Sequence, residues 1–83
     1  MARVTVYGTA VCPYCVQAKR LLSERSIPYD EVDIDADEGR RDEMIERAGG
    51  RRTVPQIFID GTYVGGYTEL RALADAGGLA GLP

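Results

Sequence analysis

The sequence predicts an α/β domain in which helices cover both faces of a mixed four-stranded sheet, in the order β-α-β-α-β-β-α. Short runs of β-branched and aromatic residues alternate with segments of helical periodicity. The first strand, helix and strand form a βαβ unit, so their strands should be parallel with a right-handed crossover. Asp60-Gly61 lies between the last two strand runs and is typical of a two-residue hairpin, which makes that pair antiparallel.

The first strand and helix meet at a cysteine motif. Residues 3–7 read Arg-Val-Thr-Val-Tyr and favour a strand. Pro13 suits the first position of a helix, where no backbone N–H is needed, and the helix continues through residues 16–22. Its expected inner face holds Ala18, Leu21 and Leu22.

The second strand and helix follow Pro28, which disfavours helix at the residue before it. Residues 29–34 alternate apolar and acidic side chains, as a half-buried strand does. The residues expected on its apolar side are Tyr29, Val32 and Ile34. Residues 38–48 then predict a helix that begins with acidic residues and ends at Gly49-Gly50. Met44, Ile45 and Ala48 form its apolar stripe.

The last third of the chain predicts a hairpin and a helix. Residues 56–59 are the most strand-like run, and residues 62–64 form the returning strand. We expect the final helix over residues 68–76, with Thr68 as its N-cap. Its inner face should hold Leu70, Leu73 and Ala74.

Composition limits the classes of function. The 83 residues suffice for one domain, residues 1–83, and a net charge of −3 argues against nucleic acid or an anionic membrane as partner. No stretch approaches the roughly 20 apolar residues of a membrane span. The first residues run into a strand without a signal-peptide pattern, so we expect a cytoplasmic protein, in which thiols are kept reduced.

Both cysteines of the chain lie in Cys12-Pro13-Tyr14-Cys15, at a strand-to-helix junction. A structural disulfide here would close a tiny loop and add little stability. Zinc needs four ligands, and the chain has no histidine, so we expect no metal site within one chain. A cluster shared between two chains stays open. A redox-active dithiol is favoured, because the helix start stabilises an anion and lowers the pKa of Cys12.

Three further stretches are candidates for ligand binding. Pro55 either opens a strand or fixes an extended segment that pairs with a thiol substrate. Gly65-Gly66-Tyr67-Thr68 is either a capped loop or a helix N-terminus that receives a carboxylate. Of the arginines between residues 40 and 52, most belong to a solvated face, and Arg41 and Arg52 are the candidates for a carboxylate clamp.

Together these stretches resemble a glutaredoxin of the short bacterial type, over nearly the whole chain. Cys12-Pro13-Tyr14-Cys15 matches the dithiol active site of that family. Thr53-Val54-Pro55 matches its T-V-P segment, in which the proline is cis. Gly65-Gly66 before a helix matches its G-G-x-D region.

The resemblance implies a thioredoxin fold, no bound cofactor, and glutathione as co-substrate. Cys12 is then the nucleophile and Cys15 the resolving thiol. The implied glutathione contacts are Tyr14, Thr53, Val54, Pro55, Gly66, Tyr67 and Thr68, with Arg41 or Arg52 as the added candidates.

Two positions depart from the family pattern. The family usually has a lysine where this chain has Thr9, and an aspartate where it has Thr68. The lysine supports the thiolate and binds the glycine carboxylate of glutathione, and the aspartate faces the γ-glutamyl ammonium. Both changes predict a weaker or altered affinity for glutathione rather than loss of the reaction.

The expected partners are glutathione and protein disulfides or glutathionylated proteins, with ribonucleotide reductase among the candidates, and the chain is expected to be a monomer. Two alternatives are kept. One is a glutaredoxin-like electron donor that thioredoxin reductase reduces. The other is a dimeric iron–sulfur cluster carrier, which Pro13 disfavours because cluster binders of the family usually have a smaller residue there.

Overall fold

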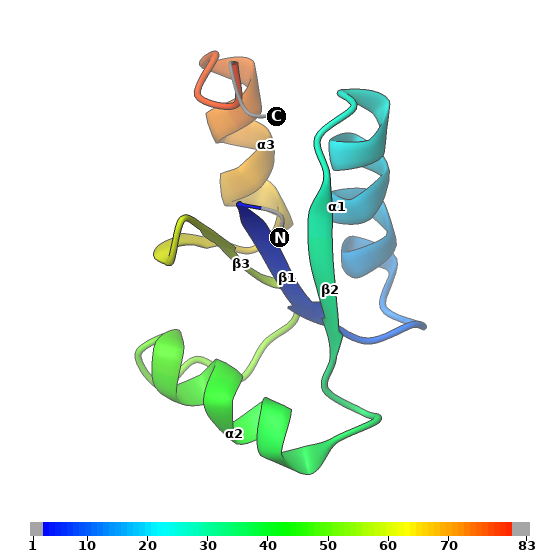
Figure 1. The fold of residues 1–83 in the computed structure, drawn as a ribbon, viewed down its shortest axis with the longest axis vertical. Helices are drawn as coiled ribbons and strands as arrows, with labels where there is room; N and C mark the ends of the chain where they lie inside the picture. Colours follow the sequence, from blue (N-terminus) through cyan, green and yellow to red (C-terminus); the bar gives the residue numbers. More distant parts are fainter. Residues whose placement is uncertain (1–2, 81–83) are drawn as a thin grey trace.

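The computed structural model describes residues 3–80 and confirms the predicted order of elements (Figure 1). These elements are β1 (Val4–Gly8), α1 (Pro13–Glu24), β2 (Tyr29–Asp33), α2 (Glu38–Arg47), β3 (Gln56–Ile59), β4 (Thr62–Gly65) and α3 (Tyr67–Asp75). Among these described residues, no helix combines the length and the apolar character that crossing a membrane requires.

The four strands form one mixed sheet in the order β2-β1-β3-β4. β1 is parallel to β2 and antiparallel to β3, and β3 and β4 form the predicted antiparallel hairpin. Asp60 and Gly61 connect the hairpin with φ angles of 52° and 81°. Two successive positive φ angles match the twist of the flanking strands, which explains why an Asp-Gly pair stands there.

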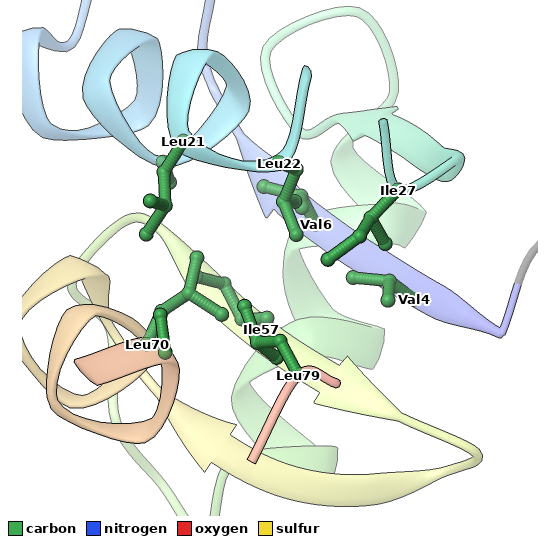
Figure 2. Packing of buried hydrophobic residues seen from close by; sticks show 10 residues of the cluster. Val4, Val6, Leu21, Leu22, Ile27, Ile57, Leu70 and Leu79 are labelled. Atoms are coloured by element: carbon green, nitrogen blue, oxygen red, sulfur yellow. The ribbon is translucent and has the colours of Figure 1, made fainter. Parts of the chain in front are cut away.

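Side chains of the sheet alternate between two cores. On one face α1 packs beside α3, and their side chains meet those of β1 and β3 (Figure 2). This cluster contains Val4, Val6, Ala18, Leu21, Leu22, Ile27, Ile57, Leu70, Ala74 and Leu79. On the other face α2 covers a smaller cluster of Tyr7, Ile34, Met44, Ala48 and Phe58. Helices on both faces are therefore confirmed.

Two local expectations are wrong. Tyr29 does not share a face with Val32 and Ile34, because it packs against the α1–α3 core while the other two contact the α2 core. Tyr29 precedes Val32 by three positions and Ile34 by five, and an odd offset along a strand places side chains on opposite faces. Ile34 itself lies just beyond the end of β2.

The second correction concerns the start of α3. The N-cap is Gly66 rather than Thr68, so the helix begins at Tyr67. The carboxylate of Glu69 accepts a hydrogen bond of 2.7 Å from the backbone N–H of Gly66. Since this side chain satisfies a backbone group at the helix start, the helix needs no hydroxyl cap, and Thr68 is exposed in the first turn.

Candidate active site

Cys12 lies at the N-cap of α1, where extended backbone turns into the helix. Its side chain is half-buried. Partial burial raises the pKa of the Cys12 thiol, but backbone N–H groups of Cys15 and Tyr14 and the Cys15 thiol bond to the sulfur, and the net pKa is lowered. The helix start therefore favours the thiolate, as the sequence predicts.

Cys15 lies in the first turn of α1, and its side chain is only 1% exposed. Burial raises the pKa of the Cys15 thiol to about 11. That pKa is the net result, because the neighbouring Cys12 adds to the rise while the backbone N–H of Thr9 and the positive charge of Lys19 oppose it. The two thiols therefore differ in acidity, with the lower pKa at Cys12 and the higher pKa at Cys15.

The Val54–Pro55 segment lies beside Cys12 although 42 residues separate Val54 from it. The peptide bond between Val54 and Pro55 is cis, as the family resemblance implies. The Cys12 thiol donates to the carbonyl oxygen of Val54 at 3.7 Å. The fold therefore places the T-V-P segment next to the Cys12 thiol.

A groove of about 200 Å³ runs from this segment to the start of α3. It contains seven residues expected to contact glutathione, namely Tyr14, Thr53, Val54, Pro55, Gly66, Tyr67 and Thr68. The rings of Tyr14 and Tyr67 lie 6.4 Å apart, centre to centre, and join the α1 and α3 sides of the groove. Three segments that are distant in the sequence thus form one concave surface beside Cys12.

The two arginines chosen from the sequence do not line this groove. Arg41 forms an ion pair of 3.1 Å with Asp35. Arg52 is exposed. The arginine that lines the groove is Arg51, one residue away from Arg52 in the chain.

Four groove residues were not found by sequence reasoning: Arg51, Gln56, Tyr63 and Glu69. The first three form a chain of hydrogen bonds to the T-V-P segment. Arg51 donates to the Tyr63 hydroxyl at 2.8 Å, which donates to the Gln56 carbonyl oxygen at 2.6 Å. The Gln56 amide then donates to the backbone oxygen and the hydroxyl of Thr53, at 2.8 and 3.0 Å. A sequence signal for this hydrogen-bond chain is Gln56, a polar residue at the start of an otherwise apolar strand.

A dithiol of this kind can exchange disulfides. Its acidic thiol attacks a substrate disulfide, and the neighbouring protonated thiol then displaces the substrate sulfur from the mixed disulfide. Carried at the start of a helix on this sheet, it defines a thiol–disulfide oxidoreductase with a thioredoxin fold. The glutaredoxin family model matches residues 4–64. The chain belongs to the glutaredoxin family.

Several relatives cover nearly the whole chain. Glutaredoxin 3 of Escherichia coli K12 is 49% identical over 79 residues, 95% of this chain and 94% of that protein. A glutaredoxin of Neisseria meningitidis serogroup A is 47% identical and covers 99% of this chain and 96% of its own length.

Solved structures confirm the fold. The dithiolic glutaredoxin 2-C-Grx1 of Trypanosoma brucei brucei has a TM-score of 0.84 at 38% identity, covering 98% of this chain and 86% of that one. A buckwheat glutaredoxin–glutathione complex also has a TM-score of 0.84, at 25% identity, with 94% of this chain and 73% of that one covered.

Proposed function

We propose that this protein is a glutathione-dependent oxidoreductase that reduces glutathione mixed disulfides and protein disulfides in the cytoplasm. The observation that carries the proposal is the groove beside Cys12, which joins the Val54–Pro55 segment to the N-terminus of α3. A buckwheat relative of the same fold forms a complex with glutathione. The chemistry of the groove supports the same ligand here.

The groove offers matched groups for a small zwitterionic peptide. Val54 and Pro55 line the groove, and their backbone can pair with the cysteine of glutathione. The start of α3 at Gly66, Tyr67 and Thr68 suits the γ-glutamyl carboxylate, since helix N-termini favour anions. Arg51 supplies a cation for the glycine carboxylate, in the role expected of Arg41 or Arg52.

Glu69 supplies negative charge on the same surface. One of its carboxylate oxygens accepts from the N–H of Gly66. The carboxylate can therefore face the γ-glutamyl ammonium, although Thr68 replaces the aspartate usual in the family. The charge lost at Thr68 is thus partly restored one residue later.

With a glutathione mixed disulfide, the Cys12 thiolate attacks the sulfur of the glutathione half. The bond to the substrate sulfur breaks, and the released substrate thiolate takes a proton from water. A second glutathione thiolate then attacks the glutathionyl sulfur on Cys12, which yields glutathione disulfide and regenerates the thiolate. This cycle uses Cys12 alone.

With a protein disulfide, Cys12 forms a mixed disulfide with one substrate sulfur and Cys15 resolves it. The other substrate sulfur leaves as a thiol when this mixed disulfide forms. Cys15 then loses its proton as it attacks the Cys12 sulfur, and the substrate sulfur that was bound to Cys12 leaves as the second thiol. The resulting Cys12–Cys15 disulfide is reduced by two molecules of glutathione. Val11 and Tyr14, 85% and 58% exposed, give this side of the molecule apolar surface for contact with a protein substrate.

The proposal is tested by a coupled assay with glutathione, glutathione reductase and a small glutathione mixed disulfide. Wild type should turn over, Cys12→Ser should not, and Cys15→Ser should retain the reaction. A wild type that is active only with thioredoxin reductase as the reductant would contradict the proposal. Activity of Cys12→Ser would contradict the assigned roles.

A further inference from the structure

Gly8, the last residue of β1, lies directly against the Cys15 side chain. A Cβ atom placed on Gly8 would lie 2.7 Å from the Cys15 sulfur and 3.4 Å from the Cys15 Cβ. The first distance is far below the roughly 3.5–4.0 Å at which non-bonded heavy atoms attract. No side chain larger than hydrogen fits there while the sulfur stays in place.

The backbone does not require glycine at this position. Gly8 is paired with Asp33 of β2, and its carbonyl oxygen accepts from the N–H of Ile34 at 3.0 Å. Its φ angle lies outside the left-handed region, unlike that of Gly61. The position therefore has ordinary strand geometry, and the constraint on it is the space that the sulfur occupies.

The sulfur of Cys15 is held from two sides. The Gly8 backbone forms one wall, and the N–H of the next residue, Thr9, bonds to the sulfur. These contacts define a seat, formed by Gly8 and Thr9, in which the Cys15 side chain is buried.

We propose that Gly8 is a positioning residue for Cys15. Because Gly8 has no side chain, the Cys15 sulfur can occupy the space beside it. The part of this inference that concerns catalysis rests on the proposed role of Cys15 as the resolving thiol. An alanine at position 8 displaces the sulfur from its seat. It therefore alters reactions that need Cys15 more than those that need Cys12 alone.

Unfolding measurements test the seat without reference to activity. We would compare the urea midpoints of reduced wild type, Gly8→Ala, Cys15→Ala and the double variant. Gly8→Ala should lower the midpoint when Cys15 is present, and the drop should shrink by at least half in the Cys15→Ala background. An equal drop in both backgrounds, or no drop, overturns the proposal. If Gly8→Ala fails to fold, folding of the double variant supports the proposal and its failure to fold overturns it.

Two activity measurements test the positioning role. The ratio of protein-disulfide reduction to deglutathionylation should fall at least threefold in Gly8→Ala, and a smaller fall or a rise overturns the role. In a Cys12→Ser background, Gly8→Ala should also lower the pH midpoint for alkylation of Cys15, since burial is the largest cause of its high pKa. An unmoved midpoint overturns the role. If wild type shows neither reaction, the proposed function fails, while the unfolding comparison still decides whether the seat exists.

Discussion

The unequal acidity of the two thiols predicts selective alkylation by iodoacetamide. Only the thiolate reacts, so the rate at each cysteine follows its pKa. Cys12 has a lowered pKa, and its alkylation should reach half its maximal rate below pH 9.0, the ordinary value for a cysteine. A lowered pKa shifts the profile to lower pH because the thiolate forms earlier in the titration.

The expected difference at Cys15 is large enough to measure. Its pKa is raised from 9.0 to about 11. At pH 8 a thiol with the ordinary value is about 10% thiolate, whereas one with a pKa of about 11 is about 0.1% thiolate. Cys15 should therefore react about a hundredfold more slowly than an unperturbed cysteine, and more slowly still relative to Cys12.

The assay is a pH series of brief alkylations, quenched and resolved by peptide mass mapping. Cys15→Ser isolates the profile of Cys12, and Cys12→Ser isolates that of Cys15. The Cys15 midpoint should fall somewhat in Cys12→Ser, because Cys12 no longer raises it, and should stay above 9.0 because burial remains. Comparable rates at both cysteines of the wild type at pH 8 would show that the two thiols do not differ in acidity.

Two substitutions test the groove. Gln56→Leu removes the amide between Thr53 and Tyr63 and should cost about 1–3 kcal/mol of unfolding free energy. It should also raise the KM for glutathione more than it lowers kcat. The exposed control Gln17→Leu should have neither effect. A KM equal to that of wild type would argue against support of the T-V-P segment by this amide. Thr9→Lys should lower the KM for glutathione two- to fivefold, or about 0.5–1 kcal/mol for one exposed charge contact. An equal gain from Ala10→Lys would show that net charge alone is responsible.

Most of the fold follows from local patterns in the sequence. The strand-like run of residues 56–59, the Asp60-Gly61 turn and the helical stripe around Met44 each predicted an element that the structure confirms. One of the two local errors came from competition between side chains at the start of α3. Thr68 has good intrinsic capping propensity, but Glu69 reaches the Gly66 N–H and the helix begins earlier.

The site was predictable where the chain is continuous and less so where the fold brings segments together. Cys12 and Cys15 are neighbours on one helix turn, so their spacing and unequal environments follow from the helix start. The choice among several arginines depends on how the segment after α2 turns toward β4. The lining of the groove and the hydrogen bond of Arg51 to Tyr63 show that this arginine, rather than Arg52, faces the groove.

The proposed mechanism requires Cys12 to carry glutathione during the reaction. It is tested most directly by incubating Cys15→Ser with glutathione disulfide and measuring intact mass and peptide masses. The protein should gain one glutathionyl group, and that group should map to Cys12. Absence of the adduct on Cys12, or equally fast modification of Cys15 in a Cys12→Ser variant, would contradict the account.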